Sequence, residues 1–134
     1  PELGNGWFVE PTIFGGVRND MRIAQEEVFG PVLSVIPFDS ADEALSIAND
    51  SSYGLAAGVW TQDIRKIKHF SERLQAGTIW ANTYRVISYM TPLGGYKNSG
   101  LGRENGQNAI YQYLQTKSIM ISTASAVANP FIMR

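Results

Sequence analysis

Two segments of the sequence concentrate residue types that can bind or transform a small molecule. In the first, residues 25–32, the adjacent carboxylates of Glu26 and Glu27 precede Phe29 and a Gly-Pro corner. A carboxylate at such a corner can accept hydrogen bonds from two vicinal hydroxyls, and an aromatic ring can pack on a planar heterocycle. On local physics alone, a solvated pair of glutamates and a core phenylalanine at an ordinary turn is the simpler interpretation.

The second segment is the glycine-rich stretch of residues 92–104. Its glycine spacing begins like a phosphate-binding loop, but Leu101 and Gly102 occupy the positions where that loop needs lysine and a hydroxyl residue. The Gly-x-Gly at 100–102 begins like a dinucleotide-binding fingerprint, but Asn105 replaces the third glycine. By itself, the stretch indicates tight backbone packing.

Other reactive residue types are scarce. The chain has no cysteine and a single histidine, His69. It therefore has no disulfide and no cysteine nucleophile, and a zinc or iron site would depend on scattered carboxylates. No serine lies in a Gly-x-Ser-x-Gly elbow. We predict no metal site, and we interpret His69 as a partly solvated helix residue.

Composition limits the class of protein. The 134 residues suffice for one domain with a substantial core. With 11 basic and 12 acidic side chains, the net charge of −1 leaves no basic excess for nucleic acid. The longest apolar run, residues 54–60, is too short to span a membrane, and residues 1–6 do not resemble a secretion signal, so we expect a cytoplasmic protein. Because the chain begins with Pro1, we expect a piece of a longer protein.

Strands and helices must position the two segments. Short apolar runs predict buried or half-buried strands at residues 32–36, 55–60 and 78–81. Periodicity and end signals predict helices at residues 21–28, 41–49 and 63–76. Asn19 or Asp20 is expected to begin the first helix, and Ser40 and Glu43 form a capping box at the second. This alternation predicts an α/β fold with a mainly parallel sheet and crossover helices.

Beyond these elements, residues 84–106 are expected to form a long functional or docked loop. Residues 117–122 alternate weakly and predict a terminal strand.

The motifs occur in one fixed order along the chain. They are Glu-Glu-x-Phe-Gly-Pro-Val at 26–32, Tyr-Gly-Leu-Ala at 53–56, Gln-Ala-Gly-Thr at 75–78, Asn82, and the glycine-rich stretch at 92–104. In this order they resemble the aldehyde dehydrogenase superfamily, over nearly the whole chain up to about Ser122. The resemblance implies the C-terminal portion of an NAD(P)-dependent enzyme: residues 1–115 as part of its catalytic domain and 116–134 as an oligomerisation strand and tail.

The resemblance also implies functions for single residues. Glu27 matches the glutamate that bonds the nicotinamide ribose of NAD or NADP, and Phe29 matches the ring that packs against the nicotinamide. Tyr84, Ile87 and Leu93 match positions that line the tunnel by which the aldehyde enters. Leu93 replaces the usual phenylalanine, which would widen or soften that wall.

Glu104 matches a glutamate behind the active site that assists proton relay in the family. A salt bridge from Glu104 to a neighbour such as Lys97 or Arg103 is an equally good interpretation of the same residue.

The reaction of the family needs residues that this chain lacks. A cysteine thiolate attacks the aldehyde, hydride passes to the nicotinamide, and a glutamate-activated water releases the carboxylic acid. The cysteine, that glutamate and the asparagine that stabilises the oxyanion all lie upstream of the matched stretch, and Asn82 is not that asparagine. We therefore expect the chain to be inactive alone. The resemblance also implies that it joins a homo-oligomer through its last strand. The alternative is a non-catalytic α/β interaction or regulatory module.

Overall fold

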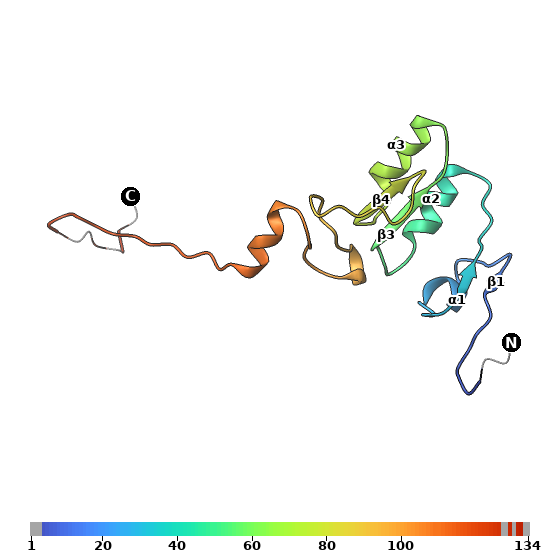
Figure 1. Ribbon diagram of the computed structural model, residues 1–134. Helices are drawn as coiled ribbons and strands as arrows, with labels where there is room; N and C mark the ends of the chain where they lie inside the picture. Colours follow the sequence, from blue (N-terminus) through green and yellow to red (C-terminus); the bar gives the residue numbers. More distant parts are fainter. Residues whose placement is uncertain (1–3, 127–128, 130, 133–134) are drawn as a thin grey trace.

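Strands and helices alternate along the chain, as an α/β fold requires (Figure 1). The computed structural model describes residues 4–126, 129 and 131–132. Its elements, with η for 3-10 helices, are β1 (Thr12–Phe14), α1 (Arg22–Gln25), β2 (Val32–Ser34), α2 (Ala41–Asn49), β3 (Ala56–Val59), α3 (Ile64–Arg73), β4 (Thr78–Ala81), η1 (Lys97–Ser99) and η2 (Gln107–Tyr113). Within these described residues, every helix is too short or too polar to cross a membrane.

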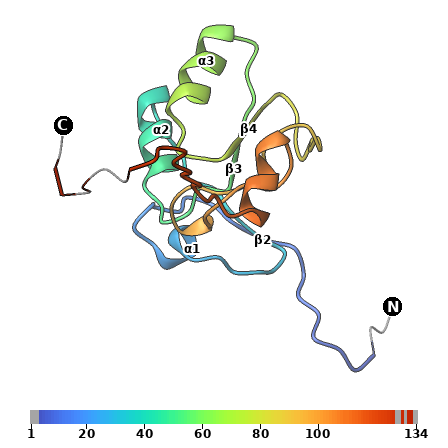
Figure 2. The same cartoon turned by 90° about the vertical axis from the view of Figure 1, so that its left-hand side faces the viewer.

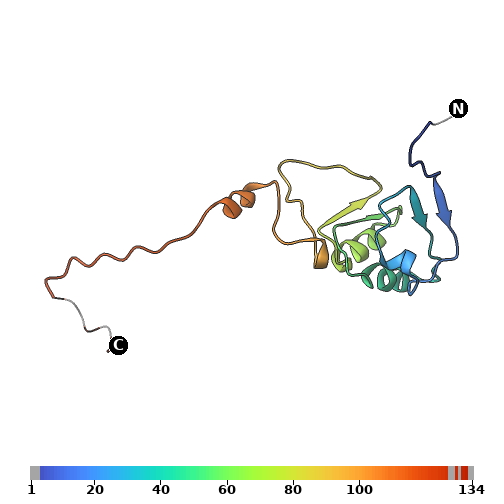
Figure 3. The same ribbon diagram turned by 90° about the horizontal axis from the view of Figure 1, so that it is seen from below.

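The strands form two parallel pairs. β1 pairs with β2, Thr12 opposite Val32, and β3 pairs with β4, Ala56 opposite Thr78. Parallel pairing confirms the prediction, but the two pairs are separate and do not make one continuous sheet. Figure 3 shows α2 and α3 on one side of the β3–β4 pair, and Figure 2 shows α1 below these two helices.

Helix α2 begins and ends where the sequence predicts. The Ser40 hydroxyl accepts a hydrogen bond from the Glu43 amide at 3.1 Å, which confirms the first half of the capping box. The Glu43 carboxylate accepts from the Asp39 amide at 2.7 Å, one residue before the amide expected. The unpaired N–H groups at this helix end are thus still satisfied by side chains.

Helix α3 is shorter than predicted because a side chain from α2 ends it. The Asn49 amide donates to the Arg73 carbonyl at 2.9 Å, and its oxygen accepts from the Gln75 amide at 2.8 Å. Leu74 is consequently extended, with ψ of 129°. The apolar periodicity predicted a longer helix because it includes Leu74. The Leu74 side chain is buried even though its backbone is no longer helical.

His69 lies at the contact between α2 and α3. Its Nε2 atom is 3.1 Å from an Asp42 carboxylate oxygen, within ion-pair distance, but has no hydrogen-bond partner among the described residues. The His69 side chain is 30% exposed, which confirms the prediction of a partly solvated helix residue.

The part of the chain that the structure describes lacks the substantial core expected from the composition. Among the described residues, the buried apolar side chains are those of Val17 and Leu74. The strand of residues 32–36, expected to be buried, leaves Leu33 57% and Val35 45% exposed. Helices α2 and α3 cover one side of the β3–β4 pair (Figure 3), and the exposure of Leu33 and Val35 shows that no described residues cover these side chains.

The last described residues extend away from the rest of the molecule (Figure 1, orange to red). The strand predicted at 117–122 is not formed, and no main-chain hydrogen bond joins those residues to other described residues. Ile119, Met120 and Ile121 are exposed. A strand exists only with a partner, and the described part of a single chain offers none here.

Candidate functional site

The turn after α1 presents Glu27 and Phe29 to solvent. Phe29 has a left-handed backbone with φ of 55° and is 91% exposed, so the interpretation as a core phenylalanine is wrong for this chain. A left-handed conformation costs a non-glycine residue roughly 1–2 kcal/mol and persists only where neighbours hold it. Two residues further on, the chain is fixed at the start of β1 and β2, where the Pro31 carbonyl accepts the Thr12 amide at 2.8 Å.

The two adjacent glutamates have different surroundings. Arg22 donates to both carboxylate oxygens of Glu26, at 2.9 and 2.7 Å, one helical turn apart. These hydrogen bonds lower the pKa of Glu26 below its ordinary value and tie down the end of α1. Glu27 is exposed and makes no ion pair with any described residue. The first glutamate therefore supports the turn, and the second is open to a ligand.

The Arg22–Glu26 pair gives a testable pH dependence. Replacing Arg22 by glutamine should raise the pKa of Glu26 to the ordinary range, because the hydrogen bonds and the positive charge are lost. A depressed carboxyl pKa stabilises the turn above its ordinary pKa, and this contribution disappears as the pH falls through the depressed value. Carboxyl carbon shifts of Glu26, followed by NMR titration, measure the change.

Arg18→Gln is the matched control, since Arg18 pairs with Asp20 at 3.1 Å and not with Glu26. A Glu26 pKa that moves equally in both variants would contradict the pairing.

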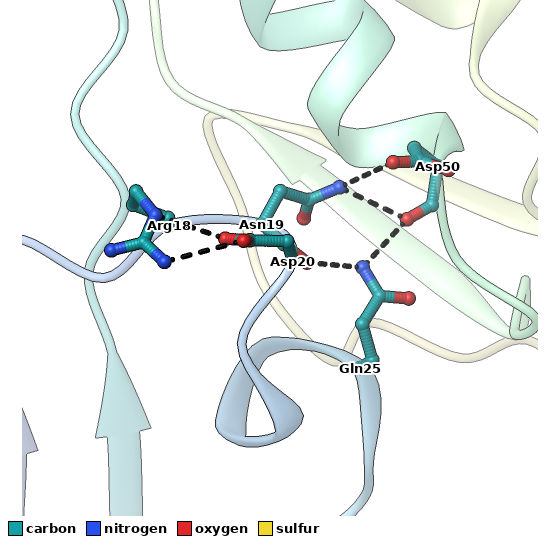
Figure 4. A network of polar contacts seen from close by, with 5 residues as sticks. All are labelled: Arg18, Asn19, Asp20, Gln25 and Asp50. Atoms are coloured by element: carbon teal, nitrogen blue, oxygen red, sulfur yellow. Dashed lines mark hydrogen bonds and ion pairs between the residues drawn. The ribbon is translucent and has the colours of Figure 1, made fainter.

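A polar network fixes α1 against the end of α2 (Figure 4). The Asn19 amide donates to the carboxylate and the carbonyl of Asp50 at 2.8 and 3.2 Å. Gln25 donates to the carbonyls of Asn19 and Asp50 at 2.7 and 3.0 Å. Asn19 and Asp20 therefore do not cap α1, which begins after Met21 without a side-chain cap. The network instead orients the turn that carries Glu27.

The loop after β4 brings together two of the three predicted tunnel residues. Ile87 and Leu93 line a pocket of about 280 Å³ together with Ile79 and Pro92. Tyr84 does not line it.

Tyr84 packs edge-on against the Trp80 ring of β4, at 5.6 Å between ring centroids. Trp80 also donates its indole N–H to the Val86 carbonyl at 2.8 Å. Trp80 was not identified as a site residue from the sequence. The available signal was a large aromatic residue close to the end of β4, where its side chain can anchor the loop that follows.

Glu104 lies in an antiparallel bridge that closes the same loop. Its amide and carbonyl each bond the main chain of Leu93 at 2.8 Å. Its exposed carboxylate forms no salt bridge with Lys97 or Arg103, so that interpretation is wrong. Both cations instead donate to carbonyls: Lys97 to those of Asn49 and Ser51, and Arg103 to those of Gly95 and Gly102.

The glycine-rich stretch docks on the turn before β3. The Gly54 amide donates to the Ser99 hydroxyl at 2.9 Å, and the Gly54 carbonyl accepts from the amides of Tyr96 and Gly77 at 2.8 and 3.0 Å. A Cβ atom on Gly77 would overlap the Gly94 carbonyl oxygen. The prediction of tight backbone packing is confirmed.

The model of the aldehyde dehydrogenase family matches residues 1–119. The chain belongs to this family. A betaine aldehyde dehydrogenase of Bacillus subtilis (strain 168) is 48% identical over 131 residues, which are 98% of this chain and 27% of the relative.

Two solved structures agree with this assignment. An aldehyde dehydrogenase of Mycobacterium tuberculosis complexed with NAD+ is 48% identical with a TM-score of 0.84, over 95% of this chain and 26% of that one. A double mutant of the Staphylococcus aureus betaine aldehyde dehydrogenase, in complex with NAD+, is 43% identical with a TM-score of 0.87, over 96% and 26%. The chain thus spans about a quarter of the length of these relatives.

Proposed function

We propose that this chain is the C-terminal portion of an NAD(P)-dependent enzyme that oxidises a small-molecule aldehyde to a carboxylic acid. Residues 1–115 belong to the catalytic domain, and residues 116–134 are the oligomerisation strand and tail. The order of the motifs supports this position within the family. The relatives and solved neighbours are named aldehyde dehydrogenases, and the cofactor in the neighbouring complexes is NAD+.

The turn of residues 26–31 is the observation that carries the proposal. It presents an unpaired carboxylate, Glu27, beside an outward-facing ring, Phe29, on a backbone held by two strands. These groups fit a nicotinamide nucleotide, since a carboxylate accepts from ribose hydroxyls and an aromatic ring packs on the heterocycle. When bound, NAD or NADP supplies the hydride acceptor. Glu27 and Phe29 orient it.

The loop after β4 forms one wall of the aldehyde path in this proposal. Ile87 and Leu93 give that wall an apolar surface, and Tyr84 extends it toward Trp80. Glu104 accepts and releases a proton at its carboxylate behind this wall. Because Leu93 is smaller than phenylalanine, the wall admits wider aldehydes.

Purified alone, the chain should produce no NADH or NADPH in the presence of an aldehyde. It contains no cysteine, so no thiolate can form the covalent intermediate that the family reaction requires. The measurement is the absorbance of the reduced cofactor over time, with a complete family member as positive control. Aldehyde-dependent turnover above the rate without enzyme would overturn the proposal that the catalytic cysteine must come from outside this chain.

The proposal extends to assembly and location: a homo-oligomer formed through residues 117–122, in the cytoplasm. The polypeptide mass of the naturally expressed protein, measured under denaturing conditions, tests whether this chain is part of a longer enzyme. A mass near four times that of this chain supports an enzyme, and a mass equal to that of this chain supports a non-catalytic module.

A further inference from the structure

Asn82 is the residue at which the chain leaves β4 and enters the loop. Its own amide donates to the Val59 carbonyl at 2.9 Å, the last main-chain bond of the β3–β4 pair. Its side chain then makes two further bonds to one residue of the facing segment. The Thr61 amide donates to Asn82 Oδ1 at 2.9 Å, and Asn82 Nδ2 donates to the Thr61 carbonyl at 2.8 Å.

These contacts extend the sheet by one step with a side chain in place of a strand residue. The backbone of Asn82 is free to turn away, and it does so with a left-handed φ of 53°. Asparagine combines the requirements of this position, since its amide carries one donor and one acceptor and it tolerates a left-handed backbone better than most residues. Glycine offers only the backbone conformation, and ionised aspartate only the acceptor.

The turn at Asn82 decides where the loop begins its path. Four residues later, the Val86 carbonyl meets the indole N–H of Trp80, which projects from the same strand. Further along, the Gly106 amide donates to the Tyr89 carbonyl at 2.9 Å. A change in the direction of the chain at Asn82 would therefore first displace Val86 from Trp80.

We propose that Asn82 is a positioning residue: its two-point bond to Thr61 and its left-handed backbone set the path of residues 83–93 and thereby the shape of the aldehyde wall. The second part rests on the function proposed above, in which Tyr84, Ile87 and Leu93 line that wall. Asn82 itself touches neither aldehyde nor cofactor.

Asn82→Gly and Asn82→Asp test the proposal in the full-length protein that carries this chain. The glycine variant keeps the backbone conformation and loses both side-chain bonds, so it should fold; the aspartate variant keeps the acceptor alone. Asn105→Gly is the matched control, because Asn105 also has a left-handed φ, 59°, but no side-chain hydrogen bond to a described residue.

The first readout is hydrogen exchange of the Trp80 indole N–H by NMR, compared between each variant and the parent protein. We expect about tenfold faster exchange in Asn82→Gly, which loses both hydrogen bonds to Thr61, a smaller increase in Asn82→Asp, which loses one, and no change in the control. Unchanged exchange in the Asn82 variants would overturn the positioning role.

The second readout is steady-state kinetics. We expect the KM for the aldehyde to rise about tenfold in Asn82→Gly, with the KM for the cofactor unchanged. Equal rises in both KM values would show that the effect is not confined to the aldehyde wall and would overturn the proposal. If Tyr84→Ala and Ile87→Ala leave the aldehyde KM unchanged, the wall assignment fails, and the indole readout then decides the positioning role by itself.

Discussion

Alanine at position 77 is expected to detach the glycine-rich stretch from the turn before β3. The new methyl group would overlap the Gly94 carbonyl, which belongs to the backbone and cannot move without breaking the docked arrangement. Overpacking of this kind typically costs about 1–3 kcal/mol, and occasionally more. The Tyr96 amide, bonded to the Gly54 carbonyl at 2.8 Å, should lose its protection from hydrogen exchange.

Gly15→Ala is the control for this experiment. A Cβ atom on Gly15 meets no described atom within 4 Å, and its backbone is not left-handed. That variant should change the free energy of unfolding by less than about 1 kcal/mol. If Gly77→Ala preserved the protection of the Tyr96 amide as Gly15→Ala does, the docked stretch would not depend on this close approach.

Glu27→Gln should lower kcat/KM for the cofactor by about ten- to a hundredfold in the complete enzyme. A hydrogen bond to a charged acceptor contributes roughly 1.5–3 kcal/mol, and about 1.4 kcal/mol corresponds to a factor of ten. Glutamine keeps the size and loses the charge, so the ribose would be held less firmly. Hydride transfer should slow accordingly, as measured by single-turnover appearance of reduced cofactor.

The adjacent Glu26→Gln is the matched control. The Glu26 carboxylate accepts two hydrogen bonds from Arg22. Removing this charge should weaken the end of α1 and leave the cofactor kinetics within a few-fold of the parent. Normal kinetics in Glu27→Gln with both NAD and NADP would show that the carboxylate has another use, and equal losses in both variants would point to the turn as a whole.

Local signals predicted the helices, and long-range contacts decided where they stop. Ser40 caps α2 through an interaction three residues away, which the sequence displays directly. Helix α3 ends under the control of Asn49, 24 residues from Arg73, and no local pattern contains that contact. The same applies to Asn19, whose side chain is bonded to Asp50, 31 residues away, and is therefore not available as a cap.

The candidate site, too, was predicted only in part from the sequence. The motif order identified Glu27, Phe29, Tyr84, Ile87 and Leu93 as candidate site residues. Local physics favoured a core position for Phe29, which is 91% exposed, because burial depends on which layers are present. Asn82 was one of the ordered motifs, but no function was predicted for it. Its structural role depends on its two hydrogen bonds to Thr61, 21 residues earlier in the chain.

The thin apolar interior has a thermodynamic consequence. The heat capacity change of unfolding grows with the apolar area removed from water, and so does the steepness of denaturation by urea. With Val17 and Leu74 as the buried apolar side chains among the described residues, both quantities are expected to be smaller for this chain by itself than for a domain of the same length with a full core. Its melting would be gradual. A sharp calorimetric transition is therefore expected only for a longer or assembled protein in which Leu33 and its exposed neighbours are covered. Such a transition would show that this chain unfolds cooperatively with the segments that cover it.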